Sequence, residues 1–129
     1  MRIGELAEAT GTTTKTLRFY EDQGLLPAAD RTPSGYRDYT PDMLGRLDFI
    51  HRGQAAGLTL AQIKQILGIR DSGTPPCGHV SDLLTERLRD LDAQIAQLVD
   101  LRRSIAELHD NAALAEPDTC PPDQVCRYL

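Results

Sequence analysis

The segment from Val80 to Asn111 is the feature that most constrains how this chain can fold. Its 32 residues contain no Gly and no Pro, so no residue in it breaks a helix. Leucine and isoleucine recur there in alternating steps of four and three, which is typical of the seam of a two-stranded coiled coil. After Leu98 one step of three replaces a step of four, and we expect the supercoil to be disturbed locally there.

This apolar stripe predicts self-association, because most positions off the stripe are charged or polar and a single helix cannot bury it. We expect a dimerisation helix over residues 80–112, paired either antiparallel or parallel. The alternative is that the stripe packs on the chain's own N-terminal domain. The residues expected at the dimer interface are Leu84, Leu88, Leu91, Ile95, Leu98, Leu101 and Ile105.

Length and charge limit what surrounds this helix. A chain of 129 residues without Trp can form one modest core plus an appendage. No apolar run reaches membrane-spanning length and the first residues do not resemble a signal peptide, so we expect a cytoplasmic protein that does not bind membranes. Residues 1–70 carry 9 Lys/Arg against 8 Asp/Glu, whereas residues 71–129 carry 5 against 11. DNA binding would therefore depend on individually placed arginines rather than on a broad basic field.

Two short helices near the start predict a helix-turn-helix. Thr10-Gly11 ends the first helix, and Thr12 or Thr13 can cap the second. On the second helix Leu17 and Tyr20 form the inner side. The opposite side carries hydroxyl and cationic groups that suit a recognition helix in a major groove, namely Thr14, Lys15 and Arg18.

A hairpin wing is expected next, because Pro33-Ser34-Gly35 favours a turn between two extended flanks. Its side chains include groups that can bind phosphates, namely Arg31, Tyr36, Arg37 and Tyr39. A second helix pair should follow, one helix opening at Pro41 and ending near Gly57, the other ending by Gly68. Residues 71–79 then form a hinge.

Several consecutive motifs in this half resemble the MerR family of bacterial transcription regulators. They are Ile3-Gly4-Glu5-Leu6-Ala7, Thr16-Leu17-Arg18-Phe19-Tyr20-Glu21, Gly24-Leu25-Leu26-Pro27, Gly35-Tyr36-Arg37-Asp38-Tyr39 and Leu58-Thr59-Leu60-Ala61-Gln62-Ile63. The resemblance implies a mainly α fold, with a winged helix-turn-helix DNA-binding domain in residues 1–70 and an antiparallel coiled-coil dimerisation helix. It also implies binding to a promoter whose elements are too far apart, and activation, with RNA polymerase, by untwisting or bending that DNA.

The resemblance further implies roles for individual residues. Thr14, Lys15 and Arg18 would approach bases or nearby phosphates. The DNA backbone would be held by Tyr20, Arg31, Tyr36, Arg37 and Tyr39. For Tyr20 and Tyr36 a place in the core is an equal alternative.

The three cysteines suggest what the protein senses. An odd number of them in a cytoplasmic chain does not indicate a disulfide framework. Cys77 precedes the long helix, while Cys120 and Cys126 follow it within an effector loop of residues 113–129, where a short helix is expected from Pro122 to Tyr128. Antiparallel pairing would bring Cys77 of one subunit to the other two thiols of its partner. Thiolates suit soft ions, so we expect a divalent Hg, Cd, Pb or Zn effector.

Metal-sensing MerR relatives resemble this layout, and a Cys at position 77 resembles the divalent-ion sensors. Where the closest pattern has a Cys directly after the helix, this chain has Ala112, and Cys126 is an additional thiol. His79 is a candidate fourth ligand, the alternative being a solvent-facing or helix-capping histidine.

Two other functions compete with metal sensing. A thiol redox or electrophile sensor without metal would need one exposed, reactive Cys. A thiol-dependent enzyme has no support, because the chain has no Cys-x-x-Cys and no plausible Cys/His dyad around a large pocket. We therefore expect a regulator and not an enzyme.

Overall fold

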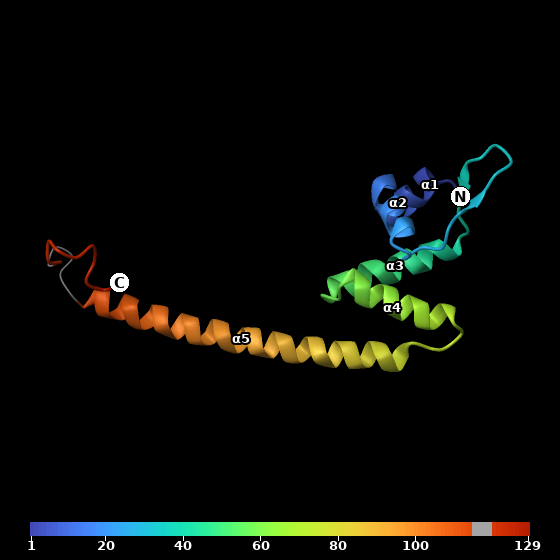
Figure 1. Ribbon diagram of the computed structural model, residues 1–129. Coiled ribbons are helices and arrows are strands. Elements are labelled where there is room, and N and C mark those ends of the chain that lie inside the picture. The colour runs from blue at the N-terminus through green and yellow to red at the C-terminus, as the bar shows by residue number, and fades with distance from the viewer. Residues whose placement is uncertain (115–119) are drawn as a thin grey trace. The chain divides into compact units, whose positions relative to one another are not determined.

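The computed structural model describes residues 1–114 and 120–129 (Figure 1). It is mainly helical, as predicted, with α1 (Ile3–Thr10), α2 (Thr14–Asp22), α3 (Asp42–Ala55), α4 (Leu60–Asp71) and α5 (Cys77–Ala113), and a hairpin of β1 (Asp30–Arg31) and β2 (Arg37–Asp38). The chain divides into two compact units, Met1–Arg87 and Leu88–Leu129. Within the described ranges, no helix combines the length and apolar character that a membrane span requires.

The helix-turn-helix forms where the helix-ending and helix-capping residues predicted it. Gly11 takes the left-handed conformation with φ 66° and ends α1, a geometry that costs glycine little. Of the two threonines considered as caps for α2, Thr13 is the one used, and its hydroxyl oxygen accepts the Thr16 N–H at 3.1 Å. This bond satisfies one of the N–H groups that a helix start leaves without a partner.

The predicted wing is an antiparallel hairpin in which Asp30 faces Asp38 and Arg31 faces Arg37. Its turn closes through Gly35, with φ 86°, whose N–H donates to the Thr32 carbonyl at 2.8 Å. Beyond β2, the Tyr39 N–H donates to the Met1 carbonyl at 2.7 Å. The base of the wing is therefore attached to the start of the chain as well as to its own partner strand.

One hydrophobic core joins the helix-turn-helix to α3 and α4, which lie side by side (Figure 1). Its largest fully buried side chains are Leu6, Leu17, Leu25, Leu26, Leu47, Ile50, Ile63 and Ile66. Helix α4 continues past Gly68, where the sequence analysis ended it, to Asp71. The left-handed glycine that follows this helix is Gly73, with φ 91°, and not Gly68.

Helix α5 begins at Cys77, within the segment that the sequence analysis assigned to the hinge. The Val80 N–H already donates to the Pro76 carbonyl at 3.0 Å, so the helical hydrogen bonds start from the proline. A proline next to a helix start loses nothing by lacking an N–H. Val80 and Leu83 then pack partly buried against the core.

The predicted apolar stripe of α5 is exposed to solvent in the single chain. Its side chains range from 36 % exposed at Leu91 to 65 % at Leu98, and α5 contains no buried residue among those described. The stripe is thus an extended apolar surface, of the kind that marks a protein–protein contact.

The predicted short helix from Pro122 to Tyr128 is not formed. Residues 120–129 contain only turns, one of them closed by the Gln124 N–H donating to the Pro121 carbonyl at 3.1 Å. A segment this short forms a helix only when tertiary packing stabilises it, and the side chains of Val125 and Leu129 are fully exposed. Residues 115–119 of the expected effector loop lie outside the described residues.

The packing of α3 on α4 can be tested at two glycines of α3. A Cβ on Gly53 would lie 2.9 Å from both Cγ1 and Cδ1 of the fully buried Ile63, whereas a Cβ on Gly45 would meet nothing within 4 Å. Gly53→Ala should therefore lower the free energy of unfolding by about 1–3 kcal/mol through overpacking. The control Gly45→Ala should raise it by about 0.5–1 kcal/mol, because alanine favours a helix. Urea unfolding followed by circular dichroism measures both, and equal effects of the two changes would contradict the packing described.

Candidate nucleic-acid interface and metal-ligating thiols

Four arginine side chains surround a shallow depression at the base of the wing. The depression has a volume of about 160 Å³ and is formed by the start of α1, by α2 and by the hairpin. Its lining residues are Arg2, Ile3, Arg18, Arg31, Gly35, Tyr36 and Arg37. Arg18 of α2 and the predicted wing residues Arg31 and Arg37 are therefore brought together on one surface, where guanidinium groups can bind phosphate oxygens.

Arg2 is a member of this cluster that the sequence analysis missed. Its guanidinium carbon lies 4.5 Å from the centre of the Tyr36 ring, a cation–π contact. Tyr36 is 56 % exposed, so the structure places it on the surface and not in the core. A single cation just before α1 carries no local sign of this role, because only the fold brings it beside the wing.

The recognition helix presents the predicted side chains. Lys15 and Arg18 are exposed and Thr14 is half-buried at the first position of α2, while Leu17 is fully buried on the other side. Thr14 and Lys15 lie in the first turn of α2 and Arg18 in the second, and helix-turn-helix proteins contact base edges from the N-terminal part of this helix. Contact of these residues with DNA stays a prediction.

Two tyrosines assigned to the DNA backbone are in the core. Tyr20 is 5 % exposed and its hydroxyl donates to Gln54 Oε1 at 3.3 Å. Tyr39 is 3 % exposed and donates to Glu21 Oε2 at 2.8 Å. Burial, followed by the hydrogen bond to the Glu21 carboxylate, raises the pKa of Tyr39 to about 12. Both hydroxyls are hydrogen-bonded within the protein. Tyr20 therefore takes the core position that was its alternative, and Tyr39, which we expected to contact the DNA backbone, is a core residue as well.

The thiols predicted to bind metal lie at both ends of α5. Cys77 is exposed at the first position of the helix, and Cys120 and Cys126 are half-buried in the C-terminal segment. The Arg127 N–H donates to Cys120 Sγ at 3.3 Å, which folds the segment so that its two cysteines belong to one turn-rich loop. All three thiols are free. Within residues 1–114 and 120–129 of a single chain, no group of three or more potential ligands is gathered around one point.

His79, the candidate fourth ligand, is half-buried near the start of α5. Its Nε2 atom is buried and has no hydrogen-bond partner among the described residues. A buried nitrogen without a partner is costly unless it gains one, so the solvent-facing alternative does not describe this atom. Whether His79 binds metal stays a prediction.

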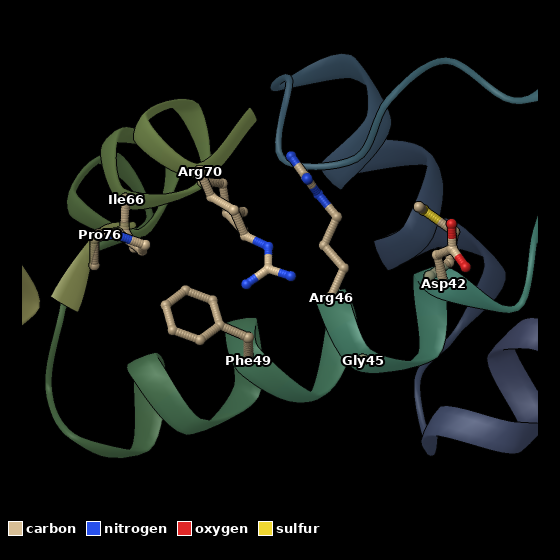
Figure 2. Close-up of a pocket in the computed structure, with 9 residues that line it drawn as sticks. Asp42, Gly45, Arg46, Phe49, Ile66, Arg70 and Pro76 are labelled. Atoms are coloured by element: carbon tan, nitrogen blue, oxygen red, sulfur yellow. The ribbon is translucent and has the colours of Figure 1, made fainter. Parts of the chain in front are cut away.

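A larger cavity of about 600 Å³ lies between α3 and α4 and contains no residue predicted to be functional (Figure 2). Arg46 fixes one wall, since it donates to the Leu25 carbonyl at 2.7 Å and to both Asp71 oxygens at 2.8 and 3.0 Å. The hydrogen bonds from Arg46 lower the pKa of Asp71. Figure 2 shows Phe49 and Arg70 directed into the space between the helices.

Comparison with known proteins assigns the family. Residues 1–68 match the model of the MerR HTH family regulatory protein, and residues 44–108 match that of the MerR DNA-binding region. The chain belongs to the MerR family. The predicted family and the predicted winged helix-turn-helix class are thereby confirmed.

Individual MerR relatives connect the family to metals and to DNA. The chain is 37 % identical over 109 residues to the mercuric resistance operon regulatory protein of Bacillus cereus, covering 84 % of this chain and 83 % of that one. It resembles the lead(II) complex of the regulator PbrR691 from Ralstonia metallidurans, with a TM-score of 0.76, 34 % identity and coverage of 93 % and 94 % of the two chains. It also resembles HiNmlR bound to promoter DNA, with a TM-score of 0.59, 26 % identity and coverage of 88 % and 89 %.

Proposed function

We propose that this MerR protein is a homodimeric transcription regulator that binds promoter DNA and senses a thiophilic divalent metal ion. Cysteine thiolates at the dimer interface bind the ion, and the protein switches the promoter, with RNA polymerase, by distorting its DNA. The contact that places Cys120 Sγ beside the backbone of Arg127, the residue after Cys126, is the observation that carries the metal-sensing part of the proposal. The relatives named for mercury and solved with lead support it. Such a regulator is not an enzyme and would act in the cytoplasm.

The DNA-binding part rests on the depression lined by Arg2, Arg18, Arg31 and Arg37. The net charge of residues 1–70 is only +1, from 9 Lys/Arg and 8 Asp/Glu, so a diffuse basic field does not provide affinity. Contacts between these placed cations and phosphates would provide it, with release of condensed counterions. Arg18, on the recognition helix, is the arginine of this group that we assign to a base edge.

Two arginine variants separate these roles. Arg18→Ala should weaken operator binding by about 1–3 kcal/mol and relax discrimination between sequences, since it removes a base contact. Arg37→Ala should weaken binding to all sequences and reduce the salt slope by about one, since it removes a phosphate contact. Fluorescence anisotropy at several salt concentrations, on operator and mixed-sequence duplexes, measures both. Equal and salt-independent losses would contradict the assignment.

Dimerisation rests on the exposed stripe of α5. A helix with eight leucine and isoleucine side chains between 36 % and 65 % exposed, from Leu84 to Leu108, lacks a partner that would bury them. A second copy supplies the same stripe, and antiparallel pairing brings the start of one helix to the end of the other. That arrangement would place Cys77 of one subunit beside the loop of its partner.

Replacing one stripe residue should dissociate the dimer. Ile95→Asp would bury a carboxylate opposite an apolar surface, which costs several kcal/mol, and should leave monomers. Ala93→Asp adds the same charge to the same helix away from the stripe and should leave the dimer intact. Sedimentation at micromolar concentration distinguishes the outcomes, and a dimeric Ile95→Asp protein would exclude the proposed interface.

The donor set favours a soft ion. Three sulfur ligands suit Hg(II), Cd(II), Pb(II) or Zn(II), whereas Mg(II) and Mn(II) prefer oxygen. Zn(II) normally takes four ligands, so His79, whose Nε2 is buried without a described partner, or a water molecule would complete its shell. Trigonal coordination of Hg(II) or Pb(II) by three thiolates would not need that fourth ligand.

A second candidate is a thiol redox or electrophile sensor without metal. The exposed, free thiol of Cys77 is the observation in its favour. Counting bound metal per dimer after aerobic and after anaerobic purification separates the two functions. A protein that carries no metal and responds to oxidants would support this candidate.

Mixed dimers test whether the ligands come from two subunits. Each single Cys→Ser change should abolish induction by metal and leave operator binding intact, because the DNA-binding half is separate. In a purified heterodimer of Cys77→Ser with Cys120→Ser/Cys126→Ser, one site keeps all three thiols and the other keeps none. Metal titration should therefore give half the wild-type stoichiometry.

Each parent homodimer is the control for this experiment and should bind no metal at the site, because every site in it lacks at least one thiol. If the heterodimer also binds none, the ligands are not shared across the interface. If the Cys77→Ser homodimer binds at full stoichiometry, Cys77 is not a ligand.

A further inference from the structure

We infer that Glu21 is a positioning residue for DNA binding, which holds the arginine of the wing in place against the recognition helix. The inference rests on the proposed function, since it concerns how that function's phosphate contacts are formed. Glu21 does not itself bind DNA in this account. It acts through Arg37, which its carboxylate contacts from α2, and the Tyr39 hydroxyl helps to hold that carboxylate in place.

The Glu21 carboxylate joins three points of the wing segment to one helix. Its Oε1 accepts the Ala29 N–H at 3.1 Å, before β1, and its Oε2 accepts the Tyr39 hydroxyl at 2.8 Å, after β2. Arg37 Nε lies 3.4 Å from the same Oε2. Both ends of the hairpin are therefore attached to one side chain that is only 14 % exposed.

The contact with Arg37 leaves the binding end of the guanidinium available. The Nε atom of Arg37 is buried and forms no hydrogen bond. The Glu21 carboxylate, 3.4 Å away, balances the charge of the guanidinium as an ion pair. A guanidinium has five N–H donors in a planar fork, and Nε is only one of them. The two terminal nitrogens can then face a phosphate while Nε faces the carboxylate.

The position of Glu21 on α2 relates the wing to the recognition helix. Glu21 follows Arg18 by three residues, so both side chains lie on the same face of α2. Arg18 and Arg37 line the same depression, and Glu21 contacts both Arg37 and the Tyr39 hydroxyl.

A carboxylate at this place is otherwise unfavourable to DNA binding. A negative charge beside a surface that attracts phosphates repels the ligand. If Glu21 only repelled phosphates, removing its charge would strengthen DNA binding. If Glu21 positions Arg37, removing its charge weakens DNA binding. The two accounts differ in the sign of the effect.

Glu21→Gln is the decisive variant. The glutamine side chain has the same shape as glutamate, and its carbonyl oxygen can still accept the Ala29 N–H. Its neutral amide cannot form an ion pair with Arg37. We expect affinity for a mixed-sequence DNA duplex to fall roughly three- to tenfold, the loss expected for one ordinary hydrogen bond, because Glu21 affects DNA binding only through Arg37. The salt slope should fall toward that of Arg37→Ala, by up to about one phosphate contact. Fluorescence anisotropy over a series of salt concentrations gives both quantities.

Asp22→Asn is the matched control. Asp22 is the next residue of α2, is exposed, and has no hydrogen bond or ion pair within the described ranges. Its removal deletes the same charge from the same helix and should leave affinity unchanged or raise it. Tyr39→Phe keeps the buried ring and removes one contact with Glu21, and should give a smaller loss in the same direction as Glu21→Gln. This second variant tests the inference if Glu21→Gln does not fold, as judged by circular dichroism.

A double mutant shows whether Glu21 acts through Arg37. If it does, Glu21→Gln should have no further effect on DNA affinity or salt slope in an Arg37→Ala background. Additive losses, or a Glu21→Gln protein that binds as tightly as Asp22→Asn, would overturn the inference. A wild-type protein without salt-dependent DNA binding would instead overturn the proposed function, so the two failures are distinguishable.

Discussion

Burial of one set of leucines and isoleucines in residues 1–87 is the interaction on which the rest of this protein depends. Leu17 from α2, Leu47 and Ile50 from α3, and Ile63 from α4 are all fully buried, so each short helix is stabilised by the others rather than by itself. The wing has only two residues in each strand and could not persist alone. It is held because Tyr39 enters the same core and carries the hydroxyl that binds Glu21.

The polar surface proposed to bind DNA follows from that core. Arg2, Arg18 and Arg37 come from different elements, and their arrangement is set by what lies beneath them: a tyrosine ring under Arg2 and a carboxylate beside Arg37. The chain is acidic overall, with a net charge of −5, so a few oriented guanidinium groups would have to supply what a general positive charge does not. Their orientation, and not their number, is what the fold contributes.

The sequence predicts element boundaries well where a residue's own conformational preference sets them. It predicts poorly the features that depend on contacts with distant residues. Helix ends and turns that depend on one residue's own backbone or side-chain preference lie where we expected them. These are the end of α1 at Gly11, the start of α2 at Thr13 and the turn at Pro33-Ser34-Gly35. Gly68 did not end α4 because glycine only permits a helix to end, and the left-handed turn comes at Gly73. Cys120-Pro121-Pro122 predicts a helix start, but the segment forms only turns, because it is too short to be helical without packing against other elements.

The sequence by itself determined the family, the mainly helical class, the α5 stripe and the position of the three cysteines at the two ends of that helix, because all of these are properties of residue type and spacing. Tertiary structure decided which tyrosines are buried and that Arg2 joins the wing. It also decided that Glu21 contacts both ends of the hairpin. These outcomes depend on side chains that are far apart in the chain and meet only after the core has formed, and no local pattern records such a meeting.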